Sequence, residues 1–318
     1  MQTSPNNYPI QNNCIEEDEI DLRELWHTIL KGKKLIISLV AGVTFLTLIY
    51  VLSIPNSYKS QATLIPIKSA SPSLGGFGGL AAMAGISIGS GGSMTPDVAF
   101  SSLLDDYEFM KNFVIKNGFD KYYQDINRDE KFVFAFGFRG IYDLFHSKKS
   151  QDEEKSQEDI IYEIIKKIKK SLSINSDKKS GLINVSYMDE DRTFPPVIIN
   201  KFLEDASKYL VKNKLDNINS QLKYFQEELN KVEEIELKQS ISVTISKIVE
   251  QKIQIKAKKY YQCDILTDPY VAYIKDKAKP KRALILIVSF ITSMILGVFL
   301  VFFIEFIKNS KDEENKNT

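Results

Sequence analysis

The strongest pattern in the chain is a pair of uninterrupted apolar runs, one toward each end. The first run covers residues 35–54, and the second covers residues 283–307, where Glu305 is the single charged residue. About 20 apolar residues in a helix span the roughly 30 Å core of a bilayer. A buried helix of a soluble domain rarely stays apolar on every face over that length. The pattern therefore predicts two transmembrane helices that bracket a long polar segment, residues 55–282.

Basic residues beside the first run set the expected orientation. The run is preceded by three lysines, Lys31, Lys33 and Lys34. Because cations next to a first span stay in the cytoplasm, we expect residues 1–34 and 308–318 to be cytoplasmic and the middle segment to lie in the bacterial periplasm. The basic stretch 275–282 argues the other way, but the charge rule is weak for long translocated domains. The first run begins too far from the N-terminus for a cleaved signal peptide, so we expect a retained signal anchor.

Small residues recur at four-residue spacing within both runs. They are Ser38 and Gly42 in the first run, and Ser289, Ser293 and Gly297 in the second. Small side chains let membrane helices approach closely, so these positions form the predicted packing surface of the two spans. Small residues are also common in membrane helices in general, which leaves a role without packing open.

Between the two runs, short periodic stretches predict a mixed domain of helices and strands. Residues 58–66 and 182–187 alternate as strands do, and residues 177–181 have the composition of a turn. One side of the first strand is expected to carry Tyr58, Ser60, Ala62 and Leu64. Apolar residues at helical spacing predict helices over residues 96–117 and 158–172. We therefore expect an α+β fold, with an α/β base domain between the spans.

A long helix is predicted from Val197 onward, and one of its faces carries a heptad repeat. The apolar positions advance by four and three residues in turn: Val211, Leu215, Ile218, Leu222, Phe225, Leu229 and Val232. This spacing is typical of helices that pack side by side, whereas packing on a domain core leaves a broader stripe. The seam therefore predicts helix packing, either within the chain or between chains.

The heptad pattern does not continue to the end of this helical region. It breaks at Glu236 and Gln239, and it resumes out of phase at Ile241, Ile245 and Ile248. A single helix rising about 1.5 Å per residue would carry the chain far from the membrane, to which it must return by the second apolar run. We therefore expect the helical region 197–260 to form a hairpin that reverses near residues 234–240. One unbroken helix stays open, because no Gly or Pro marks the break.

Candidate chemistry is sparse. The net charge of +1 argues against a nucleic-acid partner, and the only two histidines, His27 and His146, argue against a metal cluster. A span separates Cys14 from Cys263, so we expect no disulfide between them. The acidic residues 189–191 are interpreted as charge on a surface loop rather than as an acid–base pair. We expect no catalytic residue, no cofactor and no metal.

Residues 75–92 hold eight glycines interleaved with apolar side chains. A phosphate-binding loop would need a Gly-Lys-Ser/Thr sequence at the start of a helix, and no lysine lies between Lys68 and Lys111. Two interpretations stay open for this segment: a mobile loop, and a loop that packs against the membrane surface or a neighbouring subunit.

An ordered set of short stretches completes the picture. They are Glu-Ile-Asp-Leu-Arg-Glu-Leu-Trp at 19–26, Tyr-Lys-Ser-Gln-Ala-Thr-Leu at 58–64, Lys-Ser-Gly-Leu-Ile-Asn-Val-Ser-Tyr at 179–187, Asp-Pro-Tyr-Val at 268–271 and Pro-Lys-Arg-Ala at 280–283. Their order and spacing, with two spans that bracket the middle domain, resemble the Wzz-type chain-length determinants, also called polysaccharide co-polymerases. The resemblance covers most of the chain.

The resemblance implies a function. Members of this family form bell-shaped homo-oligomers in the inner membrane and control the length of a polysaccharide, commonly lipopolysaccharide O-antigen, that a Wzy-type polymerase makes. It implies a non-enzymatic scaffold whose partners are further copies of the chain, the polymerase, the growing polysaccharide and the lipid bilayer. The alternative is an inner-membrane component of a capsule or exopolysaccharide export system. A membrane-anchored enzyme is disfavoured, because no catalytic set is clustered in the sequence.

Overall fold

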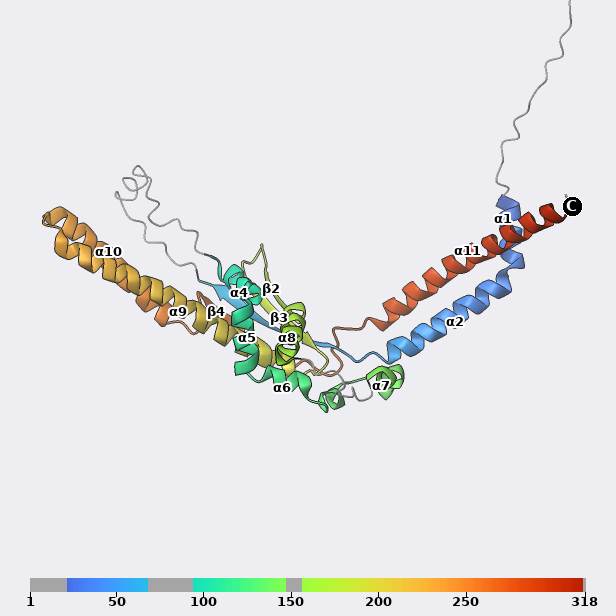
Figure 1. The fold of residues 1–318 in the computed structure, drawn as a ribbon, viewed down its shortest axis with the longest axis horizontal. Coiled ribbons are helices and arrows are strands. Elements are labelled where there is room, and N and C mark those ends of the chain that lie inside the picture. The colour runs from blue at the N-terminus through green and yellow to red at the C-terminus, as the bar shows by residue number, and fades with distance from the viewer. Residues whose placement is uncertain (1–21, 68–93, 147–155, 317–318) are drawn as a thin grey trace, which may run out of the picture. The chain divides into compact units, whose positions relative to one another are not determined.

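The structure, a computed structural model, describes residues 22–67, 94–146 and 156–316 (Figure 1). The chain divides into two compact units. One unit combines the two ends of the chain, up to Val51 and from Arg282 onward, and the other comprises Leu52–Lys281. The whole glycine-rich segment 75–92 and the N-terminal residues before Leu22 lie outside the described residues.

The unit built from the chain ends contains three helices: α1 (Leu22–Lys31), α2 (Lys33–Leu52) and α11 (Arg282–Lys316). Two stretches, Lys33–Leu52 and Arg282–Lys308, are long and apolar enough to cross a membrane. Apolar helices therefore occupy both of the places that the hydrophobic pattern predicts. Only Gly32 separates α1 from α2, so α1 leads directly into the first apolar helix.

The other unit is built on an antiparallel sheet of four strands: β1 (Tyr58–Pro66), β2 (Leu172–Ser176), β3 (Ile183–Asp189) and β4 (Cys263–Thr267). The strand order is β2-β3-β1-β4, so β1 is an inner strand. Its register with β3 runs from Tyr58 opposite Asp189 to Leu64 opposite Ile183. The strands β1 and β3 confirm the two predicted strands, while β2 and β4 were not predicted.

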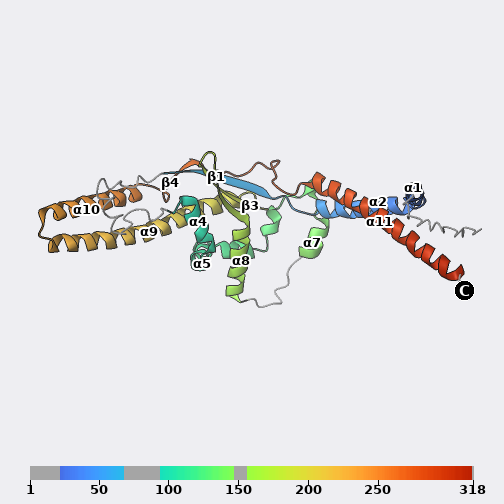
Figure 2. The same ribbon diagram turned by 90° about the horizontal axis from the view of Figure 1, so that it is seen from above.

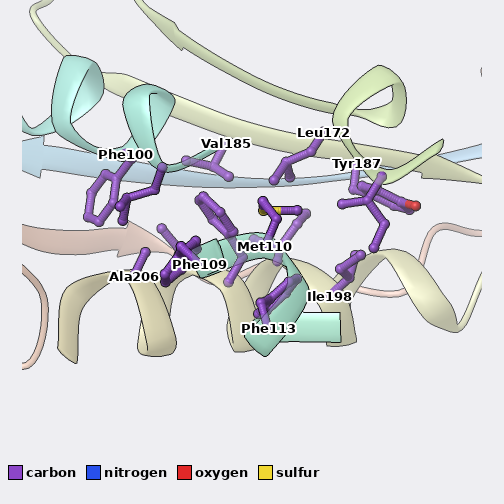
Figure 3. Packing of buried hydrophobic residues seen from close by; sticks show 14 of the residues in the cluster. Phe100, Phe109, Met110, Phe113, Leu172, Val185, Tyr187, Ile198 and Ala206 are labelled. Atoms are coloured by element: carbon purple, nitrogen blue, oxygen red, sulfur yellow. The ribbon is translucent and has the colours of Figure 1, made fainter. Parts of the chain in front are cut away.

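One face of the sheet packs against helix α9 (Phe194–Lys231), and the hydrophobic core lies between them (Figure 3). The four residues expected on one side of β1 do share a side, and the structure shows that this side is buried: Tyr58, Ser60, Ala62 and Leu64. Leu172 and Val185 approach this layer from the sheet, while Ile198 and Ala206 approach it from α9.

The remaining helices of this unit are α4 (Pro96–Asp105), α5 (Tyr107–Lys116), α6 (Phe119–Gln124), η1 (Arg128–Lys131), η2 (Ala135–Gly137), α7 (Gly140–His146) and α8 (Gln157–Ser171). The helix α8 confirms the helix predicted over residues 158–172, and Asp177 accepts a hydrogen bond from the Lys179 amide in the predicted turn. The single helix expected over residues 96–117 is wrong. Asp106 has extended backbone, and its carboxylate accepts a hydrogen bond from the Phe109 amide, so it ends α4 and caps α5.

The long helix α9 begins at Phe194, three residues before the expected start, because Pro195 and Pro196 fit in its first turn. It ends at Lys231, and α10 (Ile235–Lys256) follows after a three-residue connection, 232–234. Val232 and Glu234 both have extended backbone, which turns the chain without Gly or Pro. Figure 2 shows α9 and α10 as the two arms of a hairpin that reverses just before the expected segment.

Candidate assembly surfaces and a buried ionic cluster

The predicted heptad seam lies on the side of α9 that is withdrawn from solvent. All seven positions are buried or half-buried: Val211, Leu215, Ile218, Leu222, Phe225, Leu229 and Val232. Ile218 and Leu222 are buried in one cluster with Ile248 of α10, and Phe225 packs against that cluster. Val211 packs onto the base core instead, and Val232 lies just past the end of α9. The structure thus brings the middle of the seam together within one chain, while contact between chains stays a prediction.

Helix α10 carries a second apolar surface. Ile245, Ile248 and Ile255 face the cluster shared with α9. Val243, Val249 and Ile253 lie on another side of the helix and are exposed by 47%, 39% and 62%. A helix that uses one apolar stripe inside its own chain and leaves a second one in solvent has a surface available for a neighbouring helix.

In the unit built from the chain ends, small residues mediate the contact between the apolar helices. The hydroxyls of Thr47 and Ser289 are 2.8 Å apart, and Thr47 donates its own proton to the Val43 carbonyl. A side chain at Gly297 would place its Cβ 3.3 Å from a methyl carbon of Ile36. Together with Ser293, which is 2% exposed, these positions let α11 approach α2 closely.

The small residues of the first run do not take part in this contact. Ser38 and Gly42 are exposed, and nothing lies within 4 Å of a Cβ built at Gly42. A tight approach lies at Gly32 instead, where an added Cβ would collide with the side chain of Val301. Sequence reasoning missed Gly32 and Thr47. A polar residue within an apolar run is the signal that could have identified Thr47.

A buried ion pair lies at the end of β3. Nη2 of Arg128 donates to both carboxylate oxygens of Asp189, at 2.7 and 2.8 Å, and the two residues are only 7% and 3% exposed. Three rings surround the guanidinium at 4.6–5.5 Å from its central carbon: those of Tyr122, Tyr123 and Phe132. Such enclosure strengthens the electrostatic attraction between the charges and the ring faces.

The two buried charges of this cluster compensate each other, which suits a structural role. Burial raises the pKa of Asp189, and the charge of Arg128 opposes that shift. Burial also disfavours the charged guanidinium and is the largest single influence on it, but Asp189 and Tyr122 together outweigh burial and raise the pKa of Arg128. Next to the pair, Asp191 accepts hydrogen bonds from the amide and hydroxyl of Thr193, directly before α9 begins. The cluster therefore ties η1 to the last residue of β3 and to the start of α9.

The interpretation of residues 189–191 as surface charge is wrong for Asp189 and Asp191, which are 3% and 2% exposed. Their charges are compensated by Arg128 and Lys131, from a segment about 60 positions earlier in the chain. No local sequence pattern around Arg128 indicates that it pairs with Asp189, so this ion pair could not be predicted from the sequence.

Residues 18–116 match the family model described as Wzz, chain length determinant protein. This matched stretch, the Wzz region, is the part of the chain that is similar to that family. The resemblance inferred from the sequence is thereby confirmed. The Wzz region includes α1, α2, the inner strand β1 and the helices α4 and α5, so it joins the first apolar helix to the base of the sheet.

A solved structure described as a full-length bacterial polysaccharide co-polymerase is also similar. Its TM-score is 0.39 and its sequence identity is 14%, with 91% of this chain and 99% of that chain covered. No curated protein matches the chain.

Proposed function

We propose that this chain is a non-enzymatic, oligomeric scaffold of the bacterial inner membrane that regulates the length of a surface polysaccharide, namely lipopolysaccharide O-antigen made by a Wzy-type polymerase. The observation that carries this proposal is the Wzz match over residues 18–116. That match includes both the first apolar helix and the strand β1, around which the sheet is built.

The proposed topology places both termini in the cytoplasm and the base with its hairpin in the periplasm. Two observations support it. The apolar helices α2 and α11 lie at the two ends of the chain, and Lys33 and Lys34 open α2 at its N-terminal side. Cations beside a first span favour the cytoplasm, so the segment Leu52–Lys281 is on the side where surface glycans are assembled.

The proposed oligomer has support in each unit. Within one chain, α9 and α10 bury only part of their apolar surface, and Val249 and Ile253 of α10 stay exposed. In the other unit, Ser38 and Gly42 present a small-residue face that α11 does not use. Both surfaces suit helices of neighbouring copies. We propose that the copies meet there and that the growing polysaccharide and the polymerase are bound by the assembly.

Deletion of the gene tests the function. The lipopolysaccharide of the deletion strain, resolved on a gel, should lose its preferred O-antigen length, and expression of the full chain should restore it. An unchanged ladder together with altered capsule would favour the alternative, a component of a capsule or exopolysaccharide export system. A ladder and a capsule that are both unchanged would contradict the proposal.

Ile253→Asp tests the assembly surface on α10. Ile253 is 62% exposed within one chain, so a charge there should leave the subunit folded and weaken the contact between copies. Cross-linking in membranes should show fewer high-order species, and the O-antigen length should shift. The matched control is Gln254→Asp, which puts the same charge about 100° further round the helix. Equal assembly of wild type and Ile253→Asp would contradict a role for this surface.

A further inference from the structure

Residues 132–146, which follow η1, expose a cluster of large apolar side chains that lie close together in the sequence. Phe136 is 98% exposed, and Leu144 and Phe145 are 76% and 77% exposed. Phe138, which is 40% exposed, lies between them in the chain. Single exposed apolar residues are normal, but several aromatic ones within ten positions indicate a binding surface.

Two hydrogen bonds attach this segment to the residues that follow α2. The amide of Ile141 donates to the Ser53 hydroxyl at 3.0 Å, and the amide of Asn56 donates to the Val133 carbonyl at 2.7 Å. The ring of Phe138 lies over Gly140, and a Cβ at Gly140 would also stand 3.0 Å from the Ser53 hydroxyl. The segment is therefore held on the residue next to Leu52, the last residue of α2.

Phe136 is exposed by a strained backbone conformation. Phe136 has φ of 53° and ψ of 20°, a left-handed conformation that bulky residues rarely adopt. Gly137 beside it is also left-handed, with φ of 69°. Strain of this kind is kept at positions where it presents a side chain for binding. A phenyl ring that is held in this way and almost wholly exposed gains nothing from the interior of its own chain.

Helix α7 separates an inner side from an outer side. Tyr142 packs on the rings of Phe134 and His146, at 5.1 and 4.1 Å between centroids. Leu144 and Phe145 point elsewhere, since they remain about three-quarters exposed. The contact of Tyr142 with Phe134 attaches α7 to the preceding segment, and the exposed residues of α7 are left for a partner.

We propose that Phe136, Leu144 and Phe145 enter the interfacial layer of the same bilayer that α2 crosses, and that the base thereby rests on the membrane surface. This inference depends on the membrane placement in the proposed function. If α2 spans the bilayer, Ser53 lies at the surface, and a segment bonded to Ser53 lies there as well. Aromatic side chains favour this layer, and apolar faces insert roughly 5–10 Å into it.

A lipid surface fits this cluster better than a second copy of the chain. The main reason is the chain connection: α2 ends at Leu52, and the next residue, Ser53, accepts the hydrogen bond from Ile141. At that place the cluster lies among lipid headgroups, so a second copy of the chain would have to displace them to reach it. A lipid surface, unlike a protein partner, requires no complementary shape, so it can accept a side chain that projects as far as that of Phe136.

Single-tryptophan reporters in the full chain test the proposal. Trp26 is the one native tryptophan, so Trp26→Phe gives the background. The reporters are Phe136→Trp and Phe145→Trp. The matched aromatic control is Tyr224→Trp on α9, where the native ring is 59% exposed. Phe299→Trp on the exposed side of α11 reports membrane insertion itself. Each protein is reconstituted in vesicles of phosphatidylethanolamine and phosphatidylglycerol that carry bromine either near the headgroup or deep in the acyl chains.

Tryptophan at positions 136 and 145 should lose about half of its emission to shallow bromine and much less to deep bromine, as expected for the interfacial layer. Tryptophan at 299 should be quenched by deep bromine, and tryptophan at 224 by neither. An unquenched reporter at 299 would overturn the membrane placement, and with it the proposed function. If the reporter at 299 is quenched while those at 136 and 145 behave like the one at 224, only the interfacial contact is overturned. Blue-shifted, unquenched emission at 136 and 145 would show that protein covers the cluster, which also overturns it.

Discussion

Over residues 194–207, α9 buries a side chain on almost every turn, whereas from Val211 to its end at Lys231 it buries only Ile218 and Leu222. The first half lies in the aromatic core of the base, where Phe202 meets the rings of Phe109 and Phe113 edge to face at 6.2 and 5.8 Å. In the second half, Val211 still packs onto the base core, and among the described residues the middle of this half packs against α10 across a narrow seam. One continuous helix therefore belongs to two environments.

The difference between the halves shows what each needs for stability. A helix surrounded by a sheet and several helices buries a broad face. Each Å² of apolar surface removed from water stabilises the fold by about 25 cal/mol. A two-helix hairpin buries one stripe of each arm and leaves the rest in solvent. The base half buries enough apolar surface to be stable within a single chain, and in the proposed oligomer the hairpin half is the part that would gain most from neighbouring copies.

The largest expected effect comes from the base half. Phe202 is 0% exposed, and Phe202→Ala removes a ring from a closely packed cluster. The free energy of unfolding should fall by about 3–5 kcal/mol. Chemical denaturation of the full chain in detergent, followed by circular dichroism, measures this change. Tyr224→Ala on the hairpin half, where the ring is 59% exposed, should change stability far less. Equal effects of the two substitutions would contradict the contrast between the halves.

A smaller and local effect is expected at the seam. Ile218 is 2% exposed and, within the part of the chain that the structure describes, shares its cluster with two other buried residues, Leu222 and Ile248. Ile218→Ala should cost about 2 kcal/mol, the lower end for a buried aliphatic side chain. Amide hydrogen exchange should show faster exchange in α10 and unchanged protection in β1 and β3. Ser220→Ala is the control on the exposed side of α9. Loss of protection throughout the base would show that the halves are not independent.

The smallest effect is electrostatic and confined to the base half. Asp205 accepts hydrogen bonds from Lys116 at 2.6 Å and from Asn117 at 2.8 Å. Burial alone would raise the pKa of Asp205, but these bonds and the lysine charge hold its pKa below the usual range. A carboxyl with a lowered folded pKa stabilises the fold above its unfolded pKa of about 3.9, and this contribution is lost as the pH falls through the folded pKa.

Asp205→Asn should therefore cost about 0.5–1 kcal/mol at neutral pH, and its difference from wild type should shrink as the pH falls below about 4. Denaturation curves at several pH values measure both quantities. Glu204→Gln is the control, because its partner Lys208 lies on the solvent-exposed surface one turn away. A difference that stays constant down to low pH would contradict the assigned role of the carboxylate.

Features with a strong period could be predicted from the sequence. The apolar runs, the strand β1 with Tyr58 and Leu64 on the same side, and the helix α8 all follow from local pattern alone. The seam also identified Ile218 and Leu222, which the structure places in contact with α10. Each of these elements repeats its pattern over several turns or strand positions, so the signal exceeds the noise of single residues.

Features that depend on distant partners could not be predicted in this way. The strand β4 is short and alternates poorly, and it is defined by its pairing with β1, about 200 positions earlier. Arg128 and Asp189 are charges whose burial follows only from their meeting in space. The apolar face that runs through residues 96–117 favours one continuous helix, but the hydrogen bond from the Phe109 amide to the Asp106 carboxylate stabilises a new helix start instead. Tertiary contact, rather than composition, decides all three.

The place of β1 inside the sheet has a consequence for the order of folding. This strand leaves the ribosome early, but its two partners are β3 and β4, which end at Asp189 and Thr267. Pairings between segments so distant in sequence form late and slowly. On the proposed topology, the base cannot close its sheet until almost all of the segment before α11 has crossed the membrane. The chain would then travel through the export machinery unfolded, and the insertion of α11 would coincide with the completion of the fold.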